Sequence, residues 1–207
     1  MLHDFNDIET DGATPLDGLI QDAAGNLYGS TNHGGQNNYG TVFMLTAGGT
    51  ETLLHSFLGP LTDGSYPGGG GGKLLRDATG NLYGTTLQGG AFNSGTVFRL
   101  TSSGSESVLF NFNLAAPNRG GQPFDGLVAD PKGNLYGTAS SGGPFGNGTL
   151  YKLNPAGQEL VLHAFGEAPD DGLDPVGGLI RDPAGSLYGT TIYGGTYGCG
   201  TVFKMAP

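Results

Sequence analysis

The stretch Asp22-Ala-Ala-Gly-Asn-Leu-Tyr-Gly29 decides the fold, because close copies of it occur four times along the chain. With Leu27 as the marker, the equivalent residues are Leu82, Leu135 and Leu187, at spacings of 55, 53 and 52 residues. Each copy is followed by Gly-Thr-Val-Phe or a close variant, beginning at Gly40, Gly95, Gly148 and Gly200. A further phrase, Leu-His-x-Phe, begins at Leu2, Leu54 and Leu162, and the third copy reads Leu109-Phe-Asn-Phe112. Four repeats of roughly 52 residues therefore fill a single domain, at approximately 2–53, 54–108, 109–161 and 162–207.

Every repeat predicts four short β-strands and essentially no helix. The strand sequences are of the types Gly-Leu-Ile, Asn-Leu-Tyr-Gly-Thr-Thr, Gly-Thr-Val-Phe-x-Leu and Glu-Thr-Leu-Leu-His-Ser-Phe. Their β-branched and aromatic residues, and the Gly, Asp and Asn residues between them, are strand and turn signals. Asp-x-x-Gly between the first two strands predicts a tight turn in which the Asp side chain caps backbone amides. No stretch shows sustained helical periodicity.

Four-stranded units of this length in tandem are typical of propeller blades, so we expect an all-β fold, a β-propeller of four blades. The chain starts within a fourth strand, Leu2–Phe5, and stops after a third strand, Thr201–Met205. Pairing of these two segments would close the ring and remove an exposed edge. A monomeric ring is the expected assembly, and a dimer forming an eight-bladed ring is the alternative. A β-solenoid is the rival architecture, although its coils are usually shorter and more uniform.

Composition and charge exclude several classes of protein. The net charge is −10, from 8 basic and 18 acidic residues, so the chain lacks the basic face that a nucleic-acid binder needs. No apolar run is long enough to span a membrane. Cys199 is the only cysteine, which excludes an intrachain disulfide and a cysteine-based zinc site. Met1-Leu-His-Asp4 leads directly into strand-like sequence, so we expect no leader in this chain.

Taken together, the motifs resemble the Gloeo/Verruco (GloVer) repeat of bacterial extracellular proteins. The resemblance covers all four repeats, from Asp-x-x-Gly-Asn-Leu-Tyr-Gly-Thr-Thr to Leu-His-x-Phe. It implies a propeller fold and an extracellular or cell-surface location, and it supplies no catalytic residues. Proteins of this kind often carry more than four repeats, so the chain fits a complete ring, half of an eight-bladed dimer or a fragment. The Gly-Asn-Leu-Tyr turn is also similar to one in lactonase propellers, which is a likeness of turn chemistry rather than of activity.

Positions that are identical in all four repeats are interpreted as scaffold, because each blade needs them equally. His3, His55 and His163 share one slot, and Phe110 fills it in the third repeat, which favours packing or a backbone hydrogen bond over metal binding. The run Gly68–Gly72 does not fit a phosphate-binding loop, since Pro67 and Leu74 replace the required Gly and Ser or Thr. It is a three-residue glycine insertion in one loop. We therefore expect neither a metal nor a cofactor.

Both long loops of every repeat are predicted to lie on one face, where binding residues usually concentrate. The loops from the fourth strand to the next first strand carry three carboxylates and one guanidinium at equivalent positions: Asp11, Asp63, Asp171 and Arg119. The simpler interpretation is that each Asp-Gly forms an ordinary turn. The catalytic interpretation is that two of the aspartates flank a glycosidic bond near the channel mouth. Calcium binding at Asp170–Asp174 is a third possibility without an EF-hand pattern.

The loops from the second to the third strand add rings, an amide and an imidazole as ligand-binding candidates: His33, Gln88, Phe92, Phe145, Tyr193 and Tyr197. Aromatic planes stack on the apolar faces of sugars, although such rings could equally fill grooves between blades. We therefore expect a secreted propeller that binds a carbohydrate, or failing that a protein, through its long-loop face. The alternative is a glycoside hydrolase that uses the aspartate cluster. Near-identity of the repeats favours binding, because an enzyme breaks symmetry at its acid and base.

Overall fold

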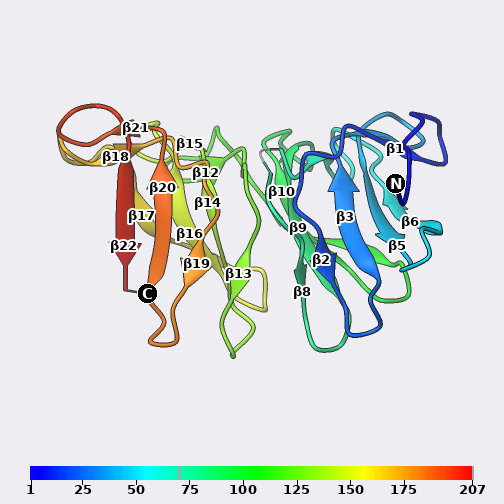
Figure 1. Ribbon diagram of the computed structural model, residues 1–207. Helices are drawn as coiled ribbons and strands as arrows, with labels where there is room; N and C mark the ends of the chain where they lie inside the picture. The colour runs from blue at the N-terminus through cyan, green and yellow to red at the C-terminus, as the bar shows by residue number, and fades with distance from the viewer. Residues whose placement is uncertain (70, 207) are drawn as a thin grey trace.

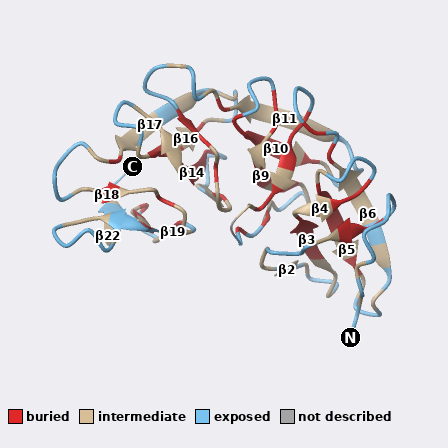
Figure 2. Ribbon diagram, turned by 90° about the horizontal axis from the view of Figure 1, so that it is seen from above, coloured by how far each residue is buried: buried red, intermediate tan, exposed pale blue. Residues whose placement is uncertain are grey.

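The computed structural model describes residues 1–69 and 71–206; Gly70, in the middle of the glycine insertion, and Pro207 lie outside the described residues. The described chain is all-β and contains no helix. Within these ranges there is accordingly no helix that could cross a membrane. Four antiparallel sheets, one for each repeat, stand side by side in an arc (Figure 1). Seen from above, the arc is open and the two termini lie at its separate ends (Figure 2).

Each sheet runs outward from a short inner strand near the centre of the arc. The first sheet has the order β2 (Ile20–Gln21), β3 (Leu27–Thr31), β5 (Thr41–Leu45) and β6 (Glu51–Ser56). The second has β8 (Leu75–Arg76), β9 (Leu82–Gln88), β10 (Thr96–Leu100) and β11 (Glu106–Asn111), with β7 (Ser65–Pro67) also paired to β9. The third has β13 (Val128–Ala129), β14 (Leu135–Ala139), β16 (Thr149–Leu153) and β17 (Glu159–Ala164). The fourth contains β19 (Ile180–Arg181), β20 (Leu187–Thr191) and β22 (Thr201–Met205).

The inner strands have two residues each, and the chain ahead of them forms further pairs. In three repeats this preceding segment forms a small two-stranded pair with the long loop between the second and third strands. These pairs are β1 (Gly12–Ala13) with β4 (His33–Gly34), β12 (Gly120–Gly121) with β15 (Ser141–Gly142), and β18 (Gly172–Leu173) with β21 (Tyr193–Gly194). In the second repeat β7 pairs directly with the end of β9. The two long loops of each repeat therefore support each other at one edge of the sheet.

The tight turns form as the Asp-x-x-Gly motif predicts. The Asp77 carboxylate accepts the backbone N–H groups of Thr79 and Asn81, both at 2.9 Å, and the Tyr83 hydroxyl at 3.0 Å. Gly80 closes the turn at φ +88°, a conformation that side chains with a Cβ rarely adopt. The same hydroxyl-to-carboxylate bond recurs from Tyr28 to Asp22, from Tyr136 to Asp130 and from Tyr188 to Asp182. These aspartates hold the turns opposite the long-loop face.

The apolar core lies between neighbouring sheets rather than within any one of them. One buried cluster joins Tyr28, Val42 and Phe57 of the first sheet and its outer edge with Leu82 and Phe98 of the second sheet. Two further clusters join the second sheet with the third and the third with the fourth. An edge-to-face ring pair sits in each boundary, at centroid distances of 5.1–5.2 Å: Phe57–Phe98, Phe112–Tyr151 and Phe165–Phe203.

The predicted pairing of Leu2–Phe5 with Thr201–Met205 is not formed, because the open arc keeps the two ends apart. Among the described residues β22 pairs with β20 alone, and residues 1–7 belong to no strand. Phe5 packs instead on Phe43 of the first sheet, with ring centroids 5.1 Å apart, as Phe57 packs on Phe98. The N-terminal segment thus covers the first sheet, while Val202 at the other end of the arc is 81% exposed.

Phe5→Ala should lower the free energy of unfolding by about 1–3 kcal/mol, less than the ~3–5 kcal/mol of a fully buried Phe, because the ring is only partly covered. Urea unfolding followed by circular dichroism measures the change. Leu2→Ala is the matched control, since Leu2 is 53% exposed, and should stay within about 0.5 kcal/mol. Equal effects of the two substitutions would show that the Phe5–Phe43 contact contributes nothing.

Candidate functional site

The three aspartates predicted to be catalytic lie in separate repeats, each beside a histidine. His3 Nε2 lies 3.2 Å from Asp11 Oδ1, His55 Nε2 lies 2.8 Å from Asp63 Oδ2, and the equivalent distance from His163 to Asp171 is 3.0 Å. No hydrogen bond or ion pair within the described ranges joins two of these aspartates. Each of these three aspartates is thus held by the histidine of its own repeat.

Asp63 shows what these carboxylates do. It is buried and accepts the backbone N–H groups of Leu58 at 2.9 Å and of Gly64 at 2.8 Å. Burial acts to raise the pKa of Asp63, but the hydrogen bonds from His55 and from these amides outweigh it and keep the pKa below its usual value. A general acid needs a raised pKa instead. The geometry therefore agrees with the simpler interpretation, in which Asp63 fixes the loop that follows the fourth strand.

Arg119 replaces this arrangement in the third repeat. Its guanidinium lies 5.7 Å from the centroid of the Phe110 ring, and Nη1 is 3.6 Å from Oε2 of Glu159. The Glu159 side chain is only 2% exposed, whereas that of Arg119 is 48% exposed. Burial raises the pKa of Glu159, and the charge of Arg119 partly opposes that shift. Arg119 thus neutralises a buried carboxylate of the neighbouring strand β17.

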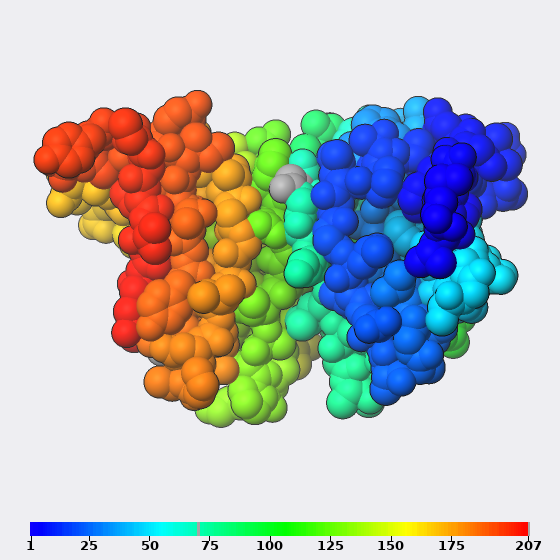
Figure 3. Space-filling view, viewed as in Figure 1, coloured from blue at the N-terminus to red at the C-terminus, as the bar shows by residue number. Residues whose placement is uncertain are grey.

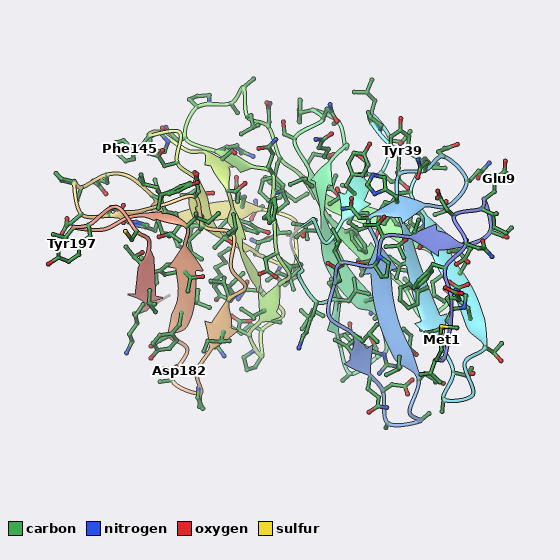
Figure 4. All side chains as sticks on the ribbon, turned by 45° about the horizontal axis from the view of Figure 1, so that its top comes forward. Met1, Glu9, Tyr39, Phe145, Asp182 and Tyr197 are labelled. Carbon is green, nitrogen blue, oxygen red and sulfur yellow. The ribbon has the colours of Figure 1, made fainter. Side chains whose placement is uncertain are left out.

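The candidate residues of the other long loops are mostly exposed. Phe92, Phe145, Tyr193 and Tyr197 are 53%, 46%, 55% and 91% exposed, so these rings do not fill grooves between the sheets. Figure 4 shows Phe145 and Tyr197 at the outer margin of the molecule, at the opposite end from Tyr39. Two other candidates, His33 in β4 and Gln88 at the end of β9, support the loops: the His33 ring lies 5.3 Å from that of Tyr66, and Gln88 pairs with Ser65.

The sequence analysis did not identify the site at the centre of the arc, where the inner strands of all four repeats meet. A cavity of about 420 Å³ lies there, with Asp125 and Lys73 as its charged lining and Ile20, Leu127 and Leu179 among its apolar lining. The surface is hollowed in this region, between the residues of the third repeat drawn in green and those of the first two repeats in blue and teal (Figure 3). Charged groups above an apolar floor are typical of small-molecule sites.

A second carboxyl group, Asp17, lies beside this cavity. It borders a small void that shares Lys73 and Gly126 with the larger cavity. The Ser30 hydroxyl donates a hydrogen bond to the Asp17 carboxylate. The other carboxylate oxygen, Oδ1, is buried without a hydrogen-bond partner among the described residues.

The glycine insertion of the second repeat passes between the two carboxyl groups. A Cβ on Gly68 would overlap the Asp17 carboxylate, and a Cβ on Gly72 would overlap the backbone nitrogen of Gly126. Gly68 also has φ +65°, which favours glycine. The centre of the arc therefore leaves no room for a side chain at Gly68 or at Gly72.

The pKa values of both central carboxyl groups are raised. Burial raises the pKa of Asp17 to about 7, the nearby charge of Asp125 adds to the shift, and hydrogen bonds from Ser30 and the Gly71 amide oppose it. Burial likewise raises the pKa of Asp125. Asp17 therefore changes its protonation state near neutral pH, which is a property that clusters at functional sites.

The sequence does carry a signal for this site, because two adjacent positions ahead of the inner strand hold different residues in different repeats. The residue two positions before the conserved inner Leu is Asp17, Gly72, Asp125 and Gly177 in the four repeats. The next position is Gly in three repeats and Lys73 in the second. Comparison of this slot across the repeats would have identified Asp17, Lys73 and Asp125.

One protein-family model matches this sequence. The model described as the Gloeobacter/Verrucomicrobia repeat matches residues 70–207, which is 138 of the 207 residues. No curated protein matches the sequence.

Among solved structures, a gluconolactonase of Xanthomonas campestris is similar over 94% of this chain and 74% of its own, with a TM-score of 0.51 and 18% identity. A second structure, assigned provisionally as a gluconolactonase, is similar over 90% of this chain with a TM-score of 0.47 and 18% identity. The chain spans only 57% of the length of that second structure. At 18% identity the likeness to the Xanthomonas campestris structure concerns the fold alone, and it supports an all-β, propeller-like architecture.

Asp17→Asn should make stability less dependent on pH. A raised pKa in the folded state means that the contribution of Asp17 is fully present below about 4 and is lost as the pH rises through about 7. Between pH 4 and 8 the free energy of unfolding of the parent should therefore fall relative to that of Asp17→Asn, by about 2–4 kcal/mol. Urea unfolding at both pH values measures this.

Glu9→Gln, at an exposed position, is the control for the loss of one acidic charge and should follow the parent. A pH dependence of Asp17→Asn that is identical to the parent would contradict the raised pKa of Asp17.

Proposed function

The chain belongs to the Gloeobacter/Verrucomicrobia repeat family, and from its central cavity we propose that it binds a small polyhydroxylated ligand of the carbohydrate class. The family match confirms the resemblance that the repeated motifs indicate. The observation that carries the proposal is the convergence of Asp125 and Lys73 in one cavity at the meeting point of four repeats.

The size and chemistry of the cavity suit such a ligand. Small-molecule sites usually enclose about 300–1,000 Å³, and this cavity of about 420 Å³ lies within that range. Sugar hydroxyls need directional donors and acceptors, which the Lys73 ammonium and the Asp125 carboxyl supply. The carbon faces of a sugar need apolar contact, which Leu127, Leu179 and Ile20 supply.

The choice of ligands to test follows from the structural neighbours. The Xanthomonas campestris protein is described as a gluconolactonase important in glucose secondary metabolic pathways. That activity is a property of the neighbour, and 18% identity does not carry it to this chain. It makes glucose, gluconate and gluconolactone the first members of a test panel.

The exposed rings of the long loops give a second candidate surface. Phe92, Phe145 and Tyr197 occupy equivalent loop positions in three successive repeats and are each close to half exposed or more. Repeated rings of this kind could stack on a longer glycan or contact a protein partner. An extracellular location, which both proposals favour, rests on the family resemblance.

Asp125→Ala and Lys73→Met should each weaken binding of the tightest panel ligand by about 10- to 100-fold, because a hydrogen bond to a charged group contributes about 1.5–3 kcal/mol. Isothermal titration calorimetry with glucose, gluconate, gluconolactone and short glucans measures this. Tyr197→Ala is the control and should leave the affinity unchanged.

The reverse pattern, with loss only in Tyr197→Ala, would move the ligand to the long-loop face. Absence of binding across the whole panel would refute the carbohydrate proposal. Turnover of gluconolactone or a glucan that disappears in Asp125→Asn would make the protein an enzyme rather than a binding module, because an amide cannot act as general acid or base.

A second proposal concerns how the open arc is completed to a ring. The edge of β22 needs a fourth strand, and the only segment of that type without a sheet, Leu2–Phe5, is held at the far end of the arc among the described residues. We propose that Leu2–Phe5 of a second copy covers β22. Light scattering should then give about 42 kDa, twice the 21.0 kDa of the chain, or a larger multiple. A mass of 21 kDa at every concentration would contradict this proposal.

A further inference from the structure

Two clusters of potential metal ligands lie away from the central cavity, one between the N-terminal segment and the first sheet and one between the first and second sheets. His3, Asp11 and Glu51 form the first cluster; His55, Asp63 and Glu106 form the second. In each cluster one ligand atom from every residue lies within 4.8 Å of the other two. The two glutamates are the first residues of β6 and β11, so each cluster links a histidine and its loop to the outer strand of the following sheet.

In the first cluster, the two distances from the histidine to the carboxylates match those between ligands of a tetrahedral site. His3 Nε2 lies 3.2 Å from Asp11 Oδ1 and 3.5 Å from Glu51 Oε2. Ligands that are about 2.0–2.1 Å from a tetrahedral zinc ion are about 3.3 Å from each other. The side chains are well covered, with 18%, 5% and 12% exposure for His3, Asp11 and Glu51. In the second cluster His55 Nε2 and Asp63 Oδ2 are 2.8 Å apart, so they need to separate by about half an ångström.

Charge in these clusters is not balanced by the protein. With a neutral imidazole, each cluster holds one Asp and one Glu carboxylate and a formal charge of −2. Burial raises the pKa of Glu51 and of Glu106, and the neighbouring aspartate charge adds to both shifts. Oε1 of each glutamate is buried without a hydrogen-bond partner among the described residues, as is Oε1 of the equivalent Glu159 in the third repeat. A buried carboxylate oxygen without a partner is costly unless a cation or a donor meets it.

The third repeat has a positive charge of its own beside the equivalent glutamate. Glu159 begins β17 and is the equivalent of Glu51 and Glu106, but Phe110 and Arg119 replace the histidine and the aspartate. The Arg119 guanidinium faces Glu159 at 3.6 Å, so the charges sum to zero. Where the chain loses the imidazole and the second carboxylate, it places its own cation against the retained glutamate.

We propose that His3, Asp11 and Glu51 bind one divalent transition-metal ion of the zinc class, and that His55, Asp63 and Glu106 bind a second. One imidazole and two carboxylates are a donor set for such an ion, with water as the fourth ligand. A charge of +2 brings each cluster to the neutrality that Arg119 and Glu159 reach by themselves. His163 and Asp171 have no equivalent glutamate within the described chain, so we assign two ions to the described residues.

Zinc titration of the untagged chain tests the stoichiometry. A Cys199→Ser background removes the exposed thiol as a competing ligand. After chelator treatment, calorimetry at pH 7.5 and elemental analysis should give two zinc ions per chain. Glu51→Gln and Glu106→Gln should each leave one ion, and the double variant should leave none. Glu159→Gln is the matched control and should still bind two ions.

A second variant keeps the test independent of folding defects. His55→Phe/Asp63→Arg copies the third repeat into the second, so it should fold and bind one ion. Zinc should also raise the melting temperature of the parent and of Glu159→Gln, and should leave that of the Glu51→Gln/Glu106→Gln variant unchanged. Fewer than one ion per chain, or equal stoichiometry in the parent and the double variant, would overturn the proposal. So would a raised pKa of His55 by NMR without any zinc response, because a protonated imidazole would then supply the missing charge.

Discussion

The fold depends above all on the edge-to-face contact between the phenylalanine just after the outer strand of one sheet and the third-strand ring of the next sheet. It occurs as Phe57–Phe98, Phe112–Tyr151 and Phe165–Phe203, and the N-terminal segment reproduces it as Phe5–Phe43. A thin sheet of this kind cannot bury an apolar face alone, so it is stable only against its neighbours. These contacts set the angle between successive sheets, and that angle brings the inner strands together around the central cavity.

The repeats depart from symmetry in two places with different consequences. At the outer boundary the third repeat changes as a coherent set: Phe110 and Arg119 appear together, and Glu159 is kept. At the centre the differences are Asp17, Asp125 and Lys73, in slots that are otherwise Gly. The outer change sets a protein cation against a buried carboxylate and so concerns stability, whereas the central residues gather charged groups in a cavity and so concern a ligand.

The sequence predicts the architecture well where the motifs are local. The Asp77 turn and the Leu27–Thr31 type of strand follow from residue type and spacing. Closure of the ring could not be predicted, because Leu2–Phe5 is compatible with any sheet that lacks a fourth strand, and the choice depends on the angle between sheets.

The sequence analysis placed Asp11, Asp63 and Asp171 at a channel mouth, and the structure places each beside a histidine. A polar residue in an Asp-Gly turn has the same sequence signature whether it faces a ligand or fixes the loop. Asp17 and Asp125 carry a signal only when the inner strands are compared across repeats.

The main proposal is that the four sheets together form one ligand-binding cavity, which is lined by Asp125 and Lys73. The most direct test is a crystal structure of the chain with the sugar or sugar acid that binds it most tightly. The account predicts ligand density in the cavity, with hydroxyl groups within hydrogen-bond distance of the Asp125 carboxyl and the Lys73 ammonium. Density confined to the loops that carry Phe145 and Tyr197, with the cavity free of ligand, would contradict it.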